Sequence, residues 1–164
     1  MTSYLKSHGP FDVLLGFSQG AIIITVLTAL RLKAVREKGA PPPEWLLNVR
    51  RECRARMRVT VKHRGVLSST SVCTHQVLVC GMPPRDNRYI ELTTQPPIDF
   101  PCTLMFGKKD HFYSYGQRLR EIYVKPDVFE HERGHEFPAG TDPLNDEWVE
   151  SMRRKLGVQQ RALV

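Results

Sequence analysis

The stretch GFSQG at residues 16–20 limits what the chain can fold into, because it has the form Gly-x-Ser-x-Gly. An apolar run, VLL at residues 13–15, leads into it, and a helix-like run at residues 21–32 follows it. In this context the pattern predicts a short strand, a sharp turn and a helix, with the serine held in a strained conformation on the turn. The strand and the helix are expected to pass close to each other at Gly16 and Gly20, where a side chain would push them apart.

Ser18, the central residue of that stretch, is a candidate nucleophile. It is expected at the N-terminus of the helix, where unpaired backbone N–H groups and the helix dipole favour a developing negative charge. The backbone N–H of Gln19 is the natural first donor to an oxyanion. The alternative is a serine and two glycines at an ordinary tight strand-to-helix turn.

Strand-like and helix-like segments alternate along the rest of the sequence. Short apolar runs bounded by Gly and Pro predict strands, and longer amphipathic segments predict helices. The strands are expected at residues 12–16, 76–80, 101–106 and 127–131, and the helices at residues 19–38, 114–123 and 143–156. Residues 44–73 fit neither pattern and are expected to form a basic insertion or a loop. The alternation predicts an α/β fold in a single domain, residues 1–164, with a mostly parallel sheet of about four strands flanked by helices.

The net charge of +7 comes largely from one segment. Residues 50–64 hold six arginines and Lys62 against Glu52, so this segment alone carries +6, while the remainder of the chain is nearly neutral. A basic segment can bind nucleic acid through phosphates, but this one has no interleaved aromatic residues and no recognisable nucleic-acid-binding motif. A solvated insertion or a surface helix is therefore the favoured interpretation, and a nucleic-acid partner is not expected.

Other features of the sequence predict a protein without a membrane partner. No apolar run approaches the roughly 20 residues needed to span a bilayer, and the first residues lack the pattern of a signal peptide. The four cysteines form no C-x-x-C pair, which fits thiols in a reducing compartment. We therefore expect an intracellular, cytoplasmic protein.

Three chemically active residues follow three different predicted strands. Ser18 follows the first strand, Asp110 follows the third, and His135 follows the fourth. In a parallel sheet the loops at the C-terminal ends of the strands carry the chemistry, so these side chains are expected to meet. The order Ser, Asp, His along the chain is also the order of the triad in α/β-hydrolases. We therefore expect His135 to exchange a proton with Ser18 while Asp110 orients the imidazole.

Each expected partner of the serine has an alternative role. Asp110 could cap the helix that follows it, and His135 could be an ordinary turn residue after Gly134. His131 and His135 are four residues apart and could be taken for zinc ligands. That spacing puts both on one face only in a helix, and Gly134 and the preceding strand pattern argue against a helix, so no metal site is expected.

Five short segments together form a pattern far more specific than Gly-x-Ser-x-Gly alone. They are GPFD at residues 9–12, LGFSQGA at 15–21, DFP at 99–101, GKKD at 107–110 and GHEFP at 134–138. With them the chain resembles the FSH serine hydrolases, which are small α/β-hydrolases without a large lid domain. The resemblance implies a cytosolic or nuclear carboxylic ester or thioester hydrolase with Ser18, Asp110 and His135 as its triad.

The resemblance also implies parts that this sequence lacks. Members of the family begin with a strand and a His-Gly loop whose backbone supplies the second oxyanion donor, whereas this sequence starts a few residues before Gly9. We therefore expect a truncated α/β-hydrolase fold whose first strand is an unpaired apolar edge, which favours self-association. The alternative to a working hydrolase is a catalytically impaired fragment that acts as a binding module.

The expected partner is a small acyl ester or thioester. Phe17, Phe112 and Tyr113 flank the predicted site and are expected to line an apolar acyl pocket, while ordinary packing is the alternative for aromatic residues beside a turn. Acyl transfer through a serine needs no metal or organic cofactor.

Overall fold

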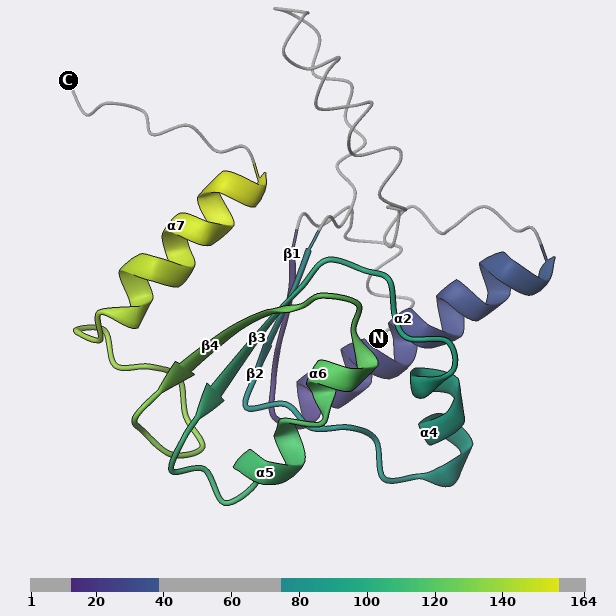
Figure 1. Cartoon of the computed structure of the whole chain (residues 1–164), viewed down its shortest axis with the longest axis horizontal. Helices are drawn as coiled ribbons and strands as arrows, with labels where there is room; N and C mark the ends of the chain where they lie inside the picture. The colour runs from purple at the N-terminus through teal and green to yellow at the C-terminus, as the bar shows by residue number, and fades with distance from the viewer. Residues whose placement is uncertain (1–12, 39–74, 157–164) are drawn as a thin grey trace, which may run out of the picture.

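The computed structural model describes residues 13–38 and 75–156, and these contain a four-stranded parallel sheet. The strands are β1 (Val13–Phe17), β2 (His75–Val79), β3 (Cys102–Gly107) and β4 (Asp127–His131), and they lie side by side in the order β1-β2-β3-β4 (Figure 1). Along the register Phe17 lies beside Val79, and Gly107 lies beside His131. All four strands therefore end at the same edge of the sheet.

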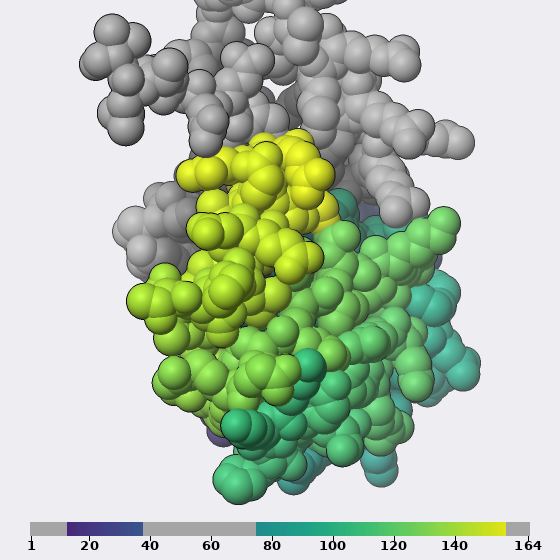
Figure 2. Space-filling view, turned by 60° about the vertical axis from the view of Figure 1, so that its left-hand side comes forward, coloured from purple at the N-terminus to yellow at the C-terminus, as the bar shows by residue number. Residues whose placement is uncertain are grey.

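Helices cover both faces of this sheet. They are α2 (Gln19–Lys38), α4 (Asn87–Thr94), α5 (Tyr113–Gly116), α6 (Leu119–Ile122) and α7 (Leu144–Leu156). In Figure 1, α2, α4 and α6 lie on one side of the strands and α7 lies on the other. The space-filling view shows α7 on the outside of the described chain, next to the segment that follows β4 (Figure 2).

The strands divide the hydrophobic core into two parts because successive side chains point to opposite faces. Leu78 packs with Ala21 and Ile24 of α2 in the first part, which also contains residues of β3 and α6. Val77 and Val79 pack with Met152 of α7 in the second part. Burial on both faces explains why β2 is an unbroken apolar run after His75 and Gln76.

A buried polar network fixes α2 against the sheet. Gln76 donates from Nε2 to Thr28 Oγ1 over 2.5 Å, and the hydroxyl of Tyr123 bonds to Gln76 Oε1 over 3.0 Å and to Thr25 Oγ1 over 3.1 Å. Both threonines also donate to helix carbonyls one turn back. These polar atoms tolerate burial because each has a partner.

The α/β fold expected from the sequence is confirmed, whereas one helix was missed and one predicted helix is divided in two. The short helix α4 was not predicted; it begins after Asp86, whose carboxylate accepts a bond from the Arg88 N–H, and it offers too few turns to show a helical period. The single helix expected at residues 114–123 is divided into α5, which ends at Gly116, and α6, which begins at Leu119. The expected insertion at residues 44–73 lies outside the described residues.

In the described part of the chain, β1 has a strand neighbour, β2, on one side only. Leu15, in the middle of β1, is 52 % exposed. Self-association through this edge stays a prediction. No helix among the described residues is both long and apolar enough to cross a membrane.

Candidate active site

Ser18 occupies the turn between β1 and α2. It has a left-handed backbone (φ 52°), its N–H donates to Val79 across the sheet, and its carbonyl accepts the N–H of Ala21 over 3.1 Å. A side chain on Gly16 would lie 2.7 Å from Ala21 N, so the expected close approach of strand and helix is confirmed at that residue. The same expectation was wrong for Gly20, because no described atom lies within 4 Å of the place its side chain would take.

Asp110 follows β3 in a turn that is held by hydrogen bonds to its backbone and to its carboxylate. Its N–H donates to the Gly107 carbonyl, and its Oδ1 accepts the N–H of Phe112 over 2.8 Å. The side chain is only 4 % exposed. The carboxylate therefore stabilises the turn before α5 with one oxygen and leaves Oδ2 for another partner.

His135 lies in the loop after β4, which runs beside the loop after β3. Lys108 N–H donates to the His131 carbonyl over 2.8 Å, and Lys109 N–H donates to the Arg133 carbonyl over 3.0 Å. These bonds extend the pairing of β3 and β4 past their ends. They bring His135 over Asp110, although 25 residues separate the two along the chain.

The structure brings Ser18, Asp110 and His135 together in one hydrogen-bonded chain. His135 Nδ1 lies 2.6 Å from Asp110 Oδ2, and His135 Nε2 lies 2.8 Å from Ser18 Oγ. A carboxylate only accepts hydrogen bonds, so Nδ1 must carry a proton and donate it. In the neutral ring Nε2 then accepts the bond from the Ser18 hydroxyl, which is the arrangement a general base requires.

Gln19 and three phenylalanines lie next to the hydrogen-bonded residues Ser18 and His135. Gln19 begins α2, where the first backbone N–H groups have no acceptor within the helix. Phe17 and Phe112 lie with ring centroids 5.1 and 5.7 Å from that of His135, and Phe137 stacks on Phe17 at 5.4 Å. All three phenylalanines are exposed, between 37 % and 42 %. They form an apolar surface around the imidazole.

Tyr113 and Phe137 differ from what the sequence suggested. The hydroxyl of Tyr113 donates to Glu130 over 2.9 Å and its ring packs on Phe106, so its contacts are with β3 and β4 rather than with His135. Phe137 was missed by the sequence analysis, although it stands two residues after His135. Its position in the sequence was the available signal, because a side chain two residues from His135 in a tight loop is held near the imidazole.

Cys80 is a second residue that the sequence analysis did not place at the site. It follows β2 with a left-handed backbone (φ 48°) and donates its N–H to the Met105 carbonyl. Its Sγ lies 3.4 Å from the Glu136 carbonyl oxygen. Burial raises the pKa of the Cys80 thiol to about 11, so the thiol is protonated at neutral pH.

Among the described residues, one group of side chains is suited to holding a metal ion. It consists of Cys80, Asp110 and His135, whose ligand atoms lie within 4.8 Å of one another. His131, considered as a zinc ligand from its spacing to His135, is not in this group; its Nδ1 accepts the Arg133 N–H over 3.3 Å.

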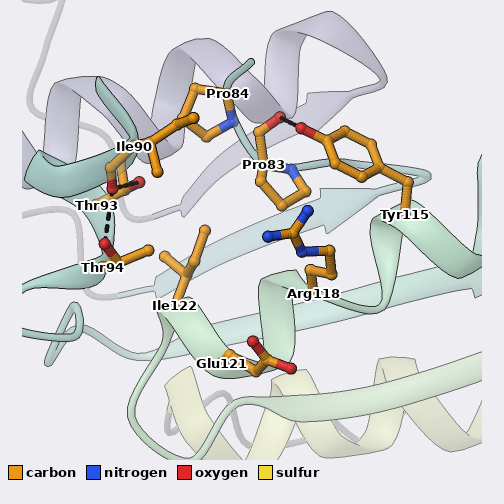
Figure 3. Close-up of a pocket in the computed structure, with 9 residues that line it drawn as sticks. All are labelled: Pro83, Pro84, Ile90, Thr93, Thr94, Tyr115, Arg118, Glu121 and Ile122. Atoms are coloured by element: carbon orange, nitrogen blue, oxygen red, sulfur yellow. Dashed lines mark hydrogen bonds between the residues drawn. The ribbon is translucent and has the colours of Figure 1, made fainter. Parts of the chain in front are cut away.

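A shallow hollow of about 60 Å³ lies between α4 and the α5–α6 segment, and the triad residues do not line it. Figure 3 shows Tyr115 at one end of it, with its hydroxyl bonded to the Pro83 carbonyl over 3.3 Å, and Arg118 beside it. Its lining residues are Pro83, Pro84, Ile90, Thr93, Thr94, Tyr115, Arg118, Glu121 and Ile122. The hollow is therefore separate from the candidate active site.

Comparison with known proteins gave one match. The family model described as Serine hydrolase (FSH1) matches residues 1–146, which include Ser18, Asp110 and His135. Neither the curated proteins nor the solved structures gave a match.

Proposed function

Since the chain belongs to the FSH1 family of serine hydrolases, we propose that it cleaves carboxylic esters or thioesters through an acyl intermediate on Ser18. The observation that carries this proposal is the continuous chain of hydrogen bonds from Ser18 through His135 to Asp110. A hydroxyl, an imidazole and a buried carboxylate in this order are the parts that nucleophilic acyl transfer needs.

In the first half of the reaction Ser18 Oγ attacks the carbonyl carbon of the substrate. His135 Nε2 accepts the hydroxyl proton as the bond forms, and Asp110 stabilises the imidazolium. The tetrahedral intermediate then expels the alcohol or thiol, which takes the proton from Nε2. Water repeats the sequence on the acyl-enzyme and releases the carboxylic acid.

The negative charge on the tetrahedral intermediate needs a donor close to Ser18. We propose the backbone N–H of Gln19, because α2 begins at this residue and the helix dipole adds a favourable field. One donor of this kind typically contributes a factor of about 100 to 1000 in rate.

The acyl group of the substrate is proposed to lie on the exposed phenylalanines around the imidazole. Phe17 and Phe112 offer apolar surface beside the imidazole of His135, and Phe137 extends it by stacking on Phe17. Burying an apolar chain there gains roughly 25 cal/mol per Å² removed from water. This favours substrates with hydrocarbon acyl groups over charged ones.

Hydrolysis of p-nitrophenyl esters and of acyl thioesters tests the proposal. Wild-type protein is expected to release the leaving group catalytically, and Ser18→Ala is expected to reduce the rate by a factor of about 1000 or more. Ser114→Ala is the matched control, since Ser114 is an exposed serine of α5. Equal rates for Ser18→Ala and Ser114→Ala would contradict the proposal.

A binding module without turnover is the second candidate, and the edge position of β1 in the described sheet favours it. Such a chain binds an acyl ligand or a partner but does not complete the reaction. A burst of one equivalent of p-nitrophenol without turnover, or saturable ligand binding without any release, would identify this candidate.

A further inference from the structure

Three side chains of types that commonly bind metal ions meet beside the serine: Cys80, Asp110 and His135. Thiolate, carboxylate and imidazole are the ligands that zinc takes in proteins. Cys80 and Asp110 are buried, while the side chain of His135 is 26 % exposed and gives an ion a path from solvent. We propose that this cluster is a Zn²⁺ site and that zinc bound there blocks the hydrolase; the effect on activity, though not the site itself, rests on the function proposed above.

The present spacing of the three ligand atoms is close to that of a zinc site. Zinc bonds of about 2.0–2.3 Å in a tetrahedral arrangement hold ligand atoms roughly 3.3–3.8 Å apart. His135 Nδ1 and Asp110 Oδ2 are 2.6 Å apart, and no ligand atom of the three lies more than 4.8 Å from another. Shifts of about an ångström would let an ion replace the proton between His135 and Asp110, with water as the fourth ligand.

Charge and the surrounding bonds also fit a divalent ion. The thiolate of Cys80 and the carboxylate of Asp110 together neutralise the two positive charges of zinc, which matters at a buried position. The Phe112 N–H already holds Asp110 Oδ1 over 2.8 Å and leaves Oδ2 for the metal. A bond of this kind to a metal-binding carboxylate fixes its orientation.

Zinc at this site would remove the general base without contacting Ser18. Coordination uses the lone pair of His135 Nδ1, so the ring proton moves from Nδ1 to Nε2, and the Cys80 thiol releases its proton to solvent. Nε2 then donates to the Ser18 hydroxyl and is unable to accept its proton. Zinc therefore holds the imidazole in the inactive tautomer.

Direct metal binding is measured on the Ser18→Ala chain, so that the result does not depend on hydrolysis. Titration with Co²⁺, which takes the same ligands as zinc, is expected to give a thiolate-to-cobalt absorption band at one equivalent. The band is expected to disappear in both Ser18→Ala/Cys80→Ala and Ser18→Ala/Cys80→Ser, because neither variant keeps a thiolate at the site, and the affinity for Co²⁺ is expected to fall at least about tenfold in both.

Two controls separate this site from other thiols. Cys102→Ala removes a buried thiol at the other end of β3, and a Cys53→Ala/Cys73→Ala double variant removes the two cysteines outside the described residues. Both are expected to keep the band. A band that survives Cys80→Ala, or no band from a folded chain with a tenfold excess of Co²⁺, would overturn the proposal.

The effect on the reaction is measured separately, with a fluorophosphonate probe and the wild-type chain. Zinc is expected to slow labelling of Ser18 at least about tenfold, and EDTA is expected to restore it. In Cys80→Ala the fractional slowing by the same zinc concentration is expected to be much smaller. Equal slowing in both proteins would contradict a block at this site, whereas absence of labelling before zinc is added would count against the hydrolase and leave the Co²⁺ titration to decide the metal site.

Discussion

The Gly134 carbonyl oxygen lies directly against the α-carbon of Gly107, with no room between them for a side chain. Gly107 is the last residue of β3, and Gly134 precedes His135 in the loop after β4. A Cβ at residue 107 would also lie 2.5 Å from the Arg133 carbonyl oxygen. The absence of a side chain at this one position lets the histidine loop close over Asp110.

Gly107→Ala is therefore expected to displace His135 while leaving most of the core intact. A shift of about 1 Å in a catalytic group can lower the rate roughly a hundredfold. The measurement is ester hydrolysis together with the urea midpoint of unfolding. Gly140→Ala is the matched control, because the position of its new methyl group is open; equal activities of the two variants would contradict this explanation.

Gly16 and Gly20 are expected to respond differently to the same substitution. A methyl group at Gly16 would meet Ala21 N and the Gly20 carbonyl carbon at 2.7 Å, so Gly16→Ala should force β1 and α2 apart and lower both stability and activity. Gly20→Ala meets no described atom, and alanine favours a helix by about 1 kcal/mol over glycine. Urea unfolding curves of the two variants decide the matter, and greater loss in Gly20→Ala would show the explanation to be wrong.

Phe137→Ala is expected to change substrate preference rather than the chemistry. Its ring stacks on Phe17 and extends the apolar surface beside His135, so its removal should raise KM for long acyl esters more than for acetate esters. The loss of roughly 1–3 kcal/mol of apolar contact corresponds to about 5- to 150-fold in kcat/KM for the long substrate. Tyr113→Phe is the control, because the Tyr113 hydroxyl faces Glu130; an equal loss for short and long esters in Phe137→Ala would argue against an acyl surface.

Acid is expected to destabilise the fold through His75. Burial, assisted by the positive charge of Lys155, lowers the pKa of His75 from 6.5 to about 4. Between these values the unfolded chain binds a proton that the folded chain does not, so this contribution to stability is complete above pH 6.5 and is lost as the pH falls toward 4. The full loss is about 3 kcal/mol.

The measurement for His75 is the free energy of unfolding between pH 7 and pH 4.5 in wild type and His75→Gln. The variant removes the titrating group, and a glutamine amide can still bond to Thr103, which lies 2.8 Å from His75 Nε2. Wild type should lose more stability than His75→Gln over this range. Parallel pH profiles would mean that His75 does not titrate as its burial suggests.

Much of the site could be predicted from the sequence because each of its three residues follows a predicted strand. Such strands in a parallel sheet end at one edge, so Ser18, Asp110 and His135 were expected to meet without knowledge of the strand order. Cys80 was not recognised, because its distance from His135 depends on the path of the loop after β4, which no periodic pattern records. Gly20 was misjudged for a related reason, since the sequence shows that a glycine is present and does not show what lies beside it.

Labelling by a fluorophosphonate probe, followed by intact mass and peptide mapping, tests most directly the claim that Ser18, His135 and Asp110 act as one unit. The account predicts one adduct per folded wild-type chain, located on Ser18, with labelling lost in Ser18→Ala and slowed by a factor of about 1000 or more in His135→Ala. A folded wild-type chain that takes no label, or takes it at a residue other than Ser18, would contradict it.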